Sequence, residues 1–475
     1  MRSLQILTVV WLGIAAPAVA ARLVPVGSEF QVNSYTTSVQ AYPAVAADAQ
    51  GDFVVVWESS YQDGSYKGVF GQRFTSTGAP AGTEFQVNTT AVGYQYSPAV
   101  SASRDGTFVV VWMSYNADGS DADIFARRYS KTGAPEGPEF RVNTDLEDPQ
   151  FAPAVAVDGG GNFVVVWESE AQDGNSSGVF GQRYDSSGTN LGTEFQINTY
   201  TTHAQLSPAV AADADGNIVV AWTSGNQDGS AEGIFGRRYG SNGFPLGPEL
   251  LVNSHTLGRQ ASPSIANDPD GGFVVAWESE GQDGSASGIF AQRYDAASDR
   301  LGTEFRVNTL TLGNQTNPVA SVDREGNLLV AWQSQQSAGE KLRIQAQLYE
   351  RTGQPAGSEF EIVRHTTFDS SYPAVAATGA GQFTVVWEGN QQDGDLSGIF
   401  GRRFGVATAP DCVGDCDGNQ LVHVNELITG VNIAIGNAQL ITCPAFDVND
   451  DGEVATNELV GAVRNALNGC AKPSG

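Results

Sequence analysis

The chain has 475 residues, with 25 Lys and Arg against 53 Asp and Glu, which gives a formal net charge of −28 at pH 7. A field of this sign repels nucleic acid and anionic membranes, so both are excluded as partners, whereas cations, basic surfaces and neutral glycans are not. The 56 glycines, 2 methionines and 16% charged residues are typical of a turn-rich all-β protein rather than a helical one.

Residues 1–20 are predicted to be a secretory signal peptide. Arg2 provides a positive start, Leu4–Ala16 is an apolar stretch, and Ala18-Val19-Ala20 is a small-residue cleavage site. An uncleaved anchor is the weaker alternative, because the apolar stretch is shorter than a membrane-spanning helix needs. No later segment is apolar enough to cross a bilayer. We therefore expect a secreted, soluble and monomeric protein, with the bacterial periplasm or cell surface as other destinations.

A repeat of 55 residues dominates the chain between residues 29 and 404. Its clearest mark is a tryptophan that ends a short apolar run such as Phe53–Trp57. The tryptophans are Trp57, Trp112, Trp167, Trp222, Trp277, Trp332 and Trp387. The glutamates that open another segment have the same spacing: Glu29, Glu84, Glu139, Glu194, Glu249, Glu304 and Glu359. A fixed period of this length indicates one supersecondary unit in seven copies.

Four strands are predicted in each copy. In the first copy they are Pro43–Ala47, Phe53–Trp57, Gly68–Phe74 and Glu84–Asn88, separated by turns rich in Gly, Asp and Ser. The second strand is apolar on both faces and needs cover on both sides, which neighbouring sheets in a ring supply. We predict an all-β seven-bladed β-propeller over residues 21–404, with four-stranded antiparallel blades and the tryptophans packed between blades.

The order of the segments also predicts how the ring closes. Counted from the proline strand, the last copy ends at Phe404 without a fourth strand, while Glu29–Asn33 stands unclaimed at the other end. We expect Glu29–Asn33 to pair with Gly398–Phe404 and to complete the last blade. The alternative, an open β-solenoid, needs no such exchange of strands.

Residues that recur in every copy are predicted to belong to the scaffold. Aspartates in the loop after the second strand are interpreted as tight-turn residues rather than ligands. They are Asp63, Asp118, Asp173, Asp228, Asp283 and Asp393, with Ala338 in the sixth copy. The same interpretation applies to turns on the opposite face, at Asp158, Asp213, Asp268 and Asp323. Third-strand arginines are expected to bond carboxylates or backbone carbonyls. They are Arg73, Arg128, Arg183, Arg238, Arg293 and Arg403, with Leu348 in the sixth copy.

An enzyme would need residues that break the pattern and converge on one place. His203, His255 and His365 lie in connections on one face, together with the least repeat-like stretches, 145–148 and 364–369. Two carboxylates at a suitable separation could hydrolyse a glycoside. Nothing in the sequence selects such a pair, so no catalytic residue is assigned. A carbohydrate-active hydrolase is the alternative to a binding or display scaffold.

The composition changes after Phe404, where 405–410 is interpreted as a linker and 411–475 as a small domain. All four cysteines lie in this domain, at Cys412, Cys416, Cys443 and Cys470. An even, clustered set in an exported chain predicts two disulfides, with three pairings open. A zinc site is the alternative, but the usual close pairs of cysteines are missing.

Residues 447–458 match the calcium-loop template D-x-[DN]-x-[DN]-G-x₅-E at every specified position. The predicted ligands are the side chains of Asp447, Asn449, Asp451 and Glu458 and the carbonyl of Glu453. An earlier copy would use Asp415, Asp417, Asn419, the carbonyl of Leu421, and Glu426. This copy has Gln420 where the template has glycine, so we expect it to be the weaker calcium site.

An apolar helix is predicted after each loop. Leu427, Ile428, Val431 and Ile435 correspond to Leu459, Val460, Val463 and Leu467, and the two faces are expected to pack together. A duplicated calcium loop with an exit helix and no entering helix resembles the dockerin type I family, calcium-dependent docking modules of secreted bacterial proteins. This resemblance implies that loop positions 1, 3, 5 and 12 bind calcium and that a cohesin-like or other cell-surface protein is the partner.

The repeat itself, with its Val-Val-Val-Trp-Glu-Ser and Gln-Asp-Gly segments, resembles repeats of large secreted and cell-surface bacterial proteins. That resemblance implies a propeller fold and no particular activity. The sequence thus predicts a secreted calcium-binding protein in which a propeller serves as a scaffold for glycans or proteins. A calcium-dependent docking module follows the propeller.

Overall fold

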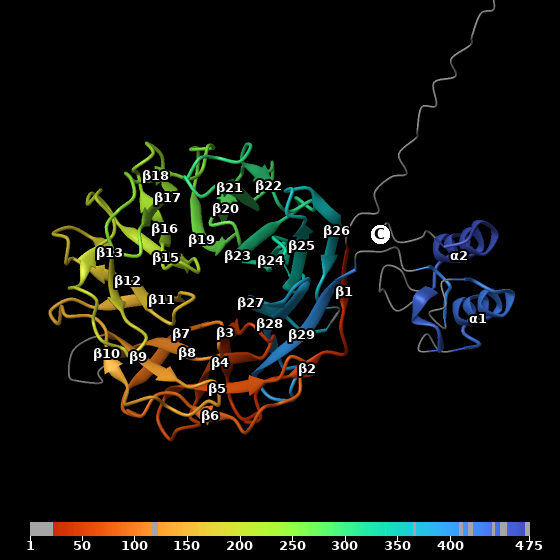
Figure 1. Cartoon of the computed structure of the whole chain (residues 1–475), viewed down its shortest axis with the longest axis horizontal. Helices are drawn as coiled ribbons and strands as arrows, with labels where there is room; N and C mark the ends of the chain where they lie inside the picture. The colour runs from red at the N-terminus through yellow and green to blue at the C-terminus, as the bar shows by residue number, and fades with distance from the viewer. Residues whose placement is uncertain are drawn as a thin grey trace, which may run out of the picture. The chain divides into compact units, whose positions relative to one another are not determined.

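The structure is a computed structural model of the chain (Figure 1). It describes residues 22–115, 122–337, 339–363, 367–407, 412–416, 421–438, 442–446 and 454–470. The predicted signal peptide lies outside these residues. The chain divides into two compact units, Leu23–Val406 and a unit that contains Ala407–Gly475.

Each repeat of the first unit forms an antiparallel sheet of four strands, here called a blade. The first blade contains β3 (Gln40–Ala47), β4 (Phe53–Ser60), β5 (Lys67–Phe74) and β6 (Phe85–Gln86). The next blades are β7 (Tyr94–Ala102), β8 (Phe108–Tyr115), β9 (Asp123–Tyr129) and β10 (Phe140–Arg141); and β11 (Gln150–Val157), β12 (Phe163–Glu170), β13 (Ser177–Tyr184) and β14 (Phe195–Gln196).

The same order continues along the chain. It gives β15 (Gln205–Ala212), β16 (Ile218–Gly225), β17 (Glu232–Tyr239) and β18 (Leu250–Leu251); β19 (Gln260–Asn267), β20 (Phe273–Glu280), β21 (Ser287–Tyr294) and β22 (Phe305–Arg306); and β23 (Asn314–Val322), β24 (Leu328–Gln335), β25 (Arg343–Tyr349) and β26 (Pro355–Glu361). Figure 1 shows these sheets following one another around a propeller-like ring, with the first strand of each nearest the centre. The predicted all-β architecture of repeated sheets is confirmed.

The blade at the two ends of this unit shows how the ring closes. It contains β27 (Ser370–Gly379), β28 (Gln382–Asn390) and β29 (Ser397–Ala407). Its fourth strand is β2 (Phe30–Gln31), which pairs antiparallel with Phe400 and Gly401, and β1 (Arg22–Pro25) also pairs with β29. A Cβ on Gly401 would lie 2.8 Å from the ring of Phe30, so this position favours glycine. The predicted pairing of Glu29–Asn33 with Gly398–Phe404 is confirmed.

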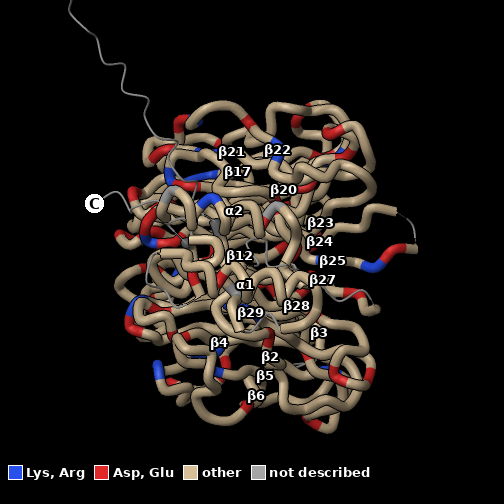
Figure 2. The backbone as a smooth tube through the Cα atoms, turned by 90° about the vertical axis from the view of Figure 1, so that its right-hand side faces the viewer, with Lys and Arg blue, Asp and Glu red and all other residues tan. Residues whose placement is uncertain are grey.

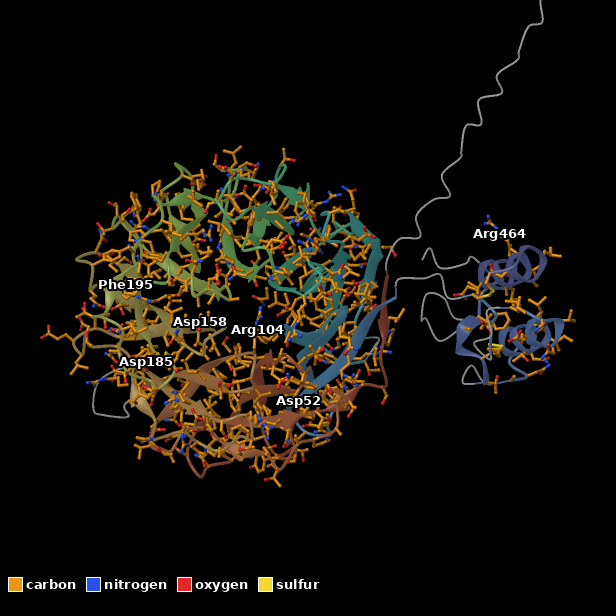
Figure 3. All side chains as sticks on the ribbon, viewed as in Figure 1. Asp52, Arg104, Asp158, Asp185, Phe195 and Arg464 are labelled. Atoms are coloured by element: carbon orange, nitrogen blue, oxygen red, sulfur yellow. A yellow bond between two sulfur atoms is a disulfide. The ribbon has the colours of Figure 1, made fainter. Side chains whose placement is uncertain are left out.

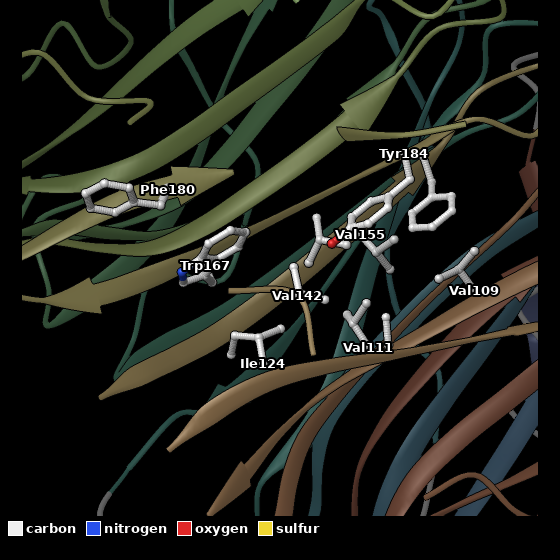
Figure 4. Packing of buried hydrophobic residues seen from close by; sticks show 11 residues of the cluster. Val109, Val111, Ile124, Val142, Val155, Trp167, Phe180 and Tyr184 are labelled. Atoms are coloured by element: carbon white, nitrogen blue, oxygen red, sulfur yellow. The ribbon is translucent and has the colours of Figure 1, made fainter. Parts of the chain in front are cut away.

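The tryptophans lie between neighbouring blades. Trp167 is fully buried with Val165 of its own blade against Val109, Val111 and Ile124 of the preceding blade (Figure 4). Its indole Nε1 donates to Gln150 Oε1 at 2.7 Å, which satisfies the one polar atom of the side chain. Removing such a ring costs about 3–5 kcal/mol of folding free energy. The tryptophans therefore act as inter-blade packing residues, as predicted.

Repeated polar residues tie each blade to the next. The guanidinium of Arg403 donates to the carbonyl of Thr77 at 2.6 Å, and that of Arg293 to the carbonyl of Arg351 at 2.7 Å. Arg128, Arg183 and Arg238 make the corresponding bonds to Ser187, Ser241 and Ala296. These arginines thus bond backbone carbonyls, and Arg128 also donates to the carboxylate of Glu136 at 2.7 Å, so both kinds of partner that the sequence predicts are found.

The described residues of the second unit form the helices α1 (Val424–Ala434) and α2 (Thr456–Asn468), with the short 3₁₀ helix η2 (Pro444–Phe446) between them. Disulfides join Cys412 to Cys470 and Cys416 to Cys443, with Cα–Cα distances of 5.3 and 4.9 Å, so the prediction of two disulfides is confirmed. The core consists of Ile433, Cys443, Phe446, Val454 and Ala462. Among the described residues, neither helix has the length and apolar character needed to span a membrane.

The prediction that the apolar faces of the two helices pack together is largely wrong. Leu427 and Leu459 do pack against the core of this unit. The other members of the two faces are exposed: Ile428, Val431 and Ile435 on α1, and Val460, Val463 and Leu467 on α2. The interior is already filled by Phe446, whose ring would lie 2.2 Å from a Cβ on Gly430 of α1. An apolar helical period identifies a face, but here the core uses a different side of each helix.

Candidate ligand-binding site

The repeated loop aspartates hold turns. Asp63 Oδ1 accepts the N–H of Ser65 at 2.9 Å, and its Oδ2 lies 3.4 Å from the amide Nδ2 of Asn88. This contact joins the two connections that the sequence places on one face, here called the loop face. The corresponding turn bonds recur at Asp173, Asp228, Asp283 and Asp393. The turn interpretation is confirmed for these positions, while Asp118 and Ala338 lie outside the described residues.

A polar cavity of about 480 Å³ lies at the centre of the ring on the opposite face, lined by the turns between the first two strands of the blades. Asp158 and Arg104, both labelled in Figure 3, are among its lining residues. Asp158 Oδ1 accepts the N–H groups of Gly160 and Asn162 at 2.8 and 2.9 Å. Asp213 makes the same pair of bonds. These carboxylates are used by their own turns, so the cavity supplies no convergent ligand set.

The glutamates that follow the tryptophan in alternate copies join neighbouring blades. Glu58 accepts the N–H of Ser97 at 2.7 Å, and Glu278 accepts that of Asn317 at 2.7 Å. Gln333 makes the equivalent bond to Tyr372 at 2.8 Å. Each N–H belongs to the residue before the proline of the next blade, where the first strand has an irregularity. The position thus has a structural role, and a glutamine serves it as well as a glutamate.

Glu388 differs from the other carboxyls because it lies where the ring closes. Burial raises the pKa of Glu388 to about 7, against the weaker opposing effects of hydrogen bonds to the N–H of Tyr42 and to Ser397. The negative charge of Glu58 raises this pKa further, whereas Lys67 lowers it. Glu388 Oε2 is buried and has no hydrogen-bond partner among the described residues. The Glu388 carboxyl therefore titrates close to neutral pH.

Two tyrosines break the repeat at the first-strand irregularity. The residue before the first-strand proline has a positive φ in every blade. In five blades it is small or polar: Ser97, Ala152, Ser207, Ser262 and Asn317. Tyr42 (φ 52°) and Tyr372 (φ 49°) occupy it in the two blades that meet at the closure. Their ring centroids are 4.4 Å apart, and the hydrogen bond to Tyr372 together with burial raises the pKa of Tyr42 above its usual value.

A row of further tyrosines continues from this pair across the first two blades. Tyr96 stacks on Tyr94 with centroids 5.4 Å apart, Tyr94 stacks on Tyr66 at 4.7 Å, and Tyr66 meets Tyr61 at 6.4 Å. Lys67 links the row to the closure, since its Nζ lies 4.9 Å from the ring centroid of Tyr96 and 5.9 Å from that of Tyr42. We call the set the tyrosine row: Tyr42, Tyr61, Tyr66, Tyr94, Tyr96 and Tyr372.

The blades provide the backbone that brings this row together. Lys67 of β5 and Tyr94 of β7 form a parallel bridge between two blades. The Oγ of Ser65 donates to the carbonyl of Gly93 at 3.2 Å, which joins the loop of Tyr61 and Tyr66 to the connection before Tyr94. The row is therefore supported by paired backbone rather than by free loops.

The tyrosine row is not among the residues that the sequence motifs select. Two repeats later, Ala171, Ser176, Ala204 and Leu206 occupy the positions of Tyr61, Tyr66, Tyr94 and Tyr96. A position-by-position comparison of the copies would have found this difference. The stretches that break the repeat in the sequence, around His203, 145–148 and 364–369, do not converge in the described residues. His203 is exposed, Asp145 accepts the N–H of Glu147 within its own turn, and His365 lies outside the described residues.

Most of the predicted calcium ligands lie outside the described residues: Asp417, Asn419, Asp447, Asn449, Asp451 and Glu453. Of the others, Glu426 accepts the N–H groups of Cys416 and His423, both at 2.7 Å, and Glu458 accepts that of Ala455 at 2.8 Å. Both carboxylates are buried at the start of a helix. In the part of the chain that the structure describes, no group of three or more His, Cys, Asp or Glu residues could hold a metal ion. The predicted calcium sites therefore remain predictions.

No family model matches the chain, and no curated protein matches it. Among solved structures, a protein of unknown function from Dyadobacter fermentans is 12% identical, with a TM-score of 0.49, 82% of this chain covered and 100% of that one. The Penicillium chrysogenum alpha-L-arabinanase complexed with arabinobiose is 13% identical, with a TM-score of 0.44 and coverages of 81% and 98%. A Hadza microbial sialidase is 13% identical, with a TM-score of 0.43 and coverages of 72% and 73%. At these TM-scores the similarities carry no argument about activity.

Proposed function

We propose that this chain is an exported seven-bladed β-propeller that acts as a binding platform and is anchored by a calcium-dependent C-terminal docking module. The observation that carries the docking part is the exposed apolar surface of the second unit. Val424, Ile428, Val431 and Ile435 follow a helical spacing on α1 and are 46–72% exposed. A soluble domain rarely leaves such a stripe open, and a stripe of this kind marks a protein interaction site.

Calcium is proposed as the ion that shapes this module. Each twelfth-position glutamate, Glu426 and Glu458, is buried at the start of its helix next to a predicted loop. A bound hard cation would neutralise these carboxylates and fix the loops, and so set the angle between α1 and α2. The two disulfides restrain the same segments, since Cys416 adjoins Asp415 and Cys443 lies before the second loop.

Isothermal titration of the full chain with calcium tests this proposal. Wild type is expected to bind calcium, and Asp447→Ala is expected to lose the stronger site. Asp185→Ala, which changes an exposed propeller turn, is the matched control and should bind as wild type. Binding to immobilised cohesin domains should then require calcium and weaken in Ile428→Ser. A wild-type chain that binds no calcium would contradict the proposal.

A carbohydrate-active hydrolase is the second candidate for the propeller. It is favoured by the pKa of about 7 for Glu388, which suits a general acid, and by the neighbouring charge of Glu58, whose carboxylate is paired with Lys67 at 2.6 Å. The tyrosine row beside these carboxyls would present a sugar to them.

A hydrolysis assay on neutral polysaccharides separates the two candidates. Glu388→Gln should abolish turnover if the chain is a hydrolase, because the amide cannot donate the proton. Glu168→Gln changes the same position in a blade without the tyrosines and should retain activity. If wild type binds a polysaccharide without hydrolysing it, the result supports the binding platform and contradicts the hydrolase.

A further inference from the structure

We propose that the tyrosine row is a binding site for a neutral oligosaccharide chain, which runs across the loop face from the centre of the ring over the first two blades. This site rests on the proposed role of the propeller as a binding platform and gives that platform a ligand class. It does not depend on calcium or on the docking module.

The exposed tyrosines of the row have the chemical character that suits a sugar ring. Tyr61 is 61% exposed, Tyr66 is 55% and Tyr42 is 42%, although tyrosines elsewhere in the ring, such as Tyr129 and Tyr239, are buried. A pyranose or furanose ring has an apolar face of C–H groups and an edge of hydroxyls. An exposed tyrosine offers a flat apolar face and a phenolic hydroxyl that donates and accepts, so it matches both parts of the sugar.

The row is also held in place before a ligand arrives. Tyr94 is stacked between Tyr66 and Tyr96 with interplanar angles of 18° and 9°. The ammonium of Lys67 covers Tyr96 and is itself held by Glu58 at 2.6 Å. Ordering a free side chain on binding lowers affinity, and these contacts have already restricted most of that freedom.

The backbone is strained at the two tyrosines nearest the centre of the ring. Tyr42 and Tyr372 have φ values of 52° and 49°, a region of the backbone that is strained for a bulky side chain. The equivalent residues of the other blades show that the scaffold needs only serine, alanine or asparagine here. Strain kept at two neighbouring blades, with both rings in contact, points to a function of the aromatic side chains.

The charge of the protein disfavours an acidic ligand at the row. Figure 2 shows Asp and Glu distributed over many parts of the chain, in keeping with its net charge of −28. The cation of the row, Lys67, is neutralised by Glu58. An acidic glycan would therefore meet an unfavourable field with no free cation in the row to offset it. A neutral glycan meets the exposed rings and phenolic hydroxyls of Tyr61, Tyr66 and Tyr42.

Affinity electrophoresis and titration calorimetry of the full chain test the inference. The probes are arabinan, xylan, galactomannan and hydroxyethylcellulose as neutral polymers, polygalacturonate as an acidic polymer, and a proline-rich peptide as the competing aromatic-binding ligand. Wild type is expected to be retarded by at least one neutral polymer and not by polygalacturonate. The affinity of the double variant Tyr66→Ala/Tyr94→Ala for that polymer should be lower than that of wild type by about tenfold or more.

Two controls keep the result interpretable. Tyr200→Ala removes a tyrosine from the connection after another repeat and should bind as wild type. Tyr66→Phe keeps the ring and should retain most of the affinity, while thermal unfolding shows whether each variant is folded. The inference is overturned if no neutral polymer binds, if the double variant is folded and binds as wild type, or if only the peptide or polygalacturonate binds. Calcium titration of the same samples reports on the docking module separately.

Discussion

Replacing Glu388 with glutamine should stabilise the propeller at alkaline pH and leave it nearly unchanged at acidic pH. Burial raises the pKa of Glu388 from its model-compound value of 4.5 to about 7. A raised folded-state pKa means that folding favours the protonated carboxyl. The stability that this preference provides is complete below pH 4.5, falls as the pH rises, and is lost above pH 7.

The size of the effect follows from the same shift. A difference of about 2.5 pKa units corresponds to about 3 kcal/mol, and screening of this partly accessible group reduces the expected value to about 1–2 kcal/mol. The amide of glutamine should fit, because Gln333 already accepts the N–H of Tyr372 at 2.8 Å in the preceding blade. The variant therefore removes the charge and keeps the inter-blade hydrogen bond.

The assay is chemical or thermal unfolding of wild type and Glu388→Gln at pH 5 and pH 8. Because burial also raises the pKa values of Glu168 and Glu278, the informative quantity is the difference in stability between the two proteins at each pH. We expect Glu388→Gln to be more stable at pH 8, with a smaller difference at pH 5. A stability difference that does not change with pH would refute the reasoning.

Three further predictions concern the closure, the disulfides and the inter-blade packing. Phe30→Ala removes a ring that lies 5.3 Å from Phe74. It should lower the unfolding temperature more than Phe195→Ala, its equivalent in an internal blade, because β2 is not joined to β29 by a turn. Equal shifts would argue against closure by β2. Reducing both disulfides should lower only the calorimetric transition of the second unit, whose Cys412–Cys470 link spans 58 residues, and a shift of the main transition would disagree. Trp167→Ala should destabilise the propeller by about 3–5 kcal/mol in denaturant unfolding, whereas a loss below about 1 kcal/mol would contradict its buried position between blades.

The sequence predicts the scaffold well because each copy carries the same local instructions. Trp57 and its equivalents end an apolar run that needs cover on both faces, and this requirement alone indicates neighbouring blades. The unclaimed segment at Phe30 predicts the closure for the same reason, since each blade needs a fourth strand. Repetition also identifies turn residues such as Asp63 as scaffold.

The tyrosine row was harder to predict because it depends on contacts between blades. Tyr66 and Tyr94 are separated by the two strands β5 and β6 and their connections, and Tyr42 and Tyr372 lie in the first and last copies of the repeat. Neither pair forms a local motif, so only the fold brings them together. The prediction that the helices of the second unit pack together through their apolar faces is wrong for a different reason. Their apolar period was recognised, but Phe446 had filled the interior and left Ile428 and its neighbours exposed.

The most direct test of the central claim, that exceptions to the repeat rather than the repeated residues bind the ligand, is hydrogen–deuterium exchange of the full chain with and without a neutral polysaccharide that retards it. Protection is predicted in the segments 61–67 and 94–96 and around Tyr42 and Tyr372. The equivalent segments 171–177 and 204–206 should be unaffected. Equal protection of these equivalent segments, or no protection of the tyrosine row, would contradict the account.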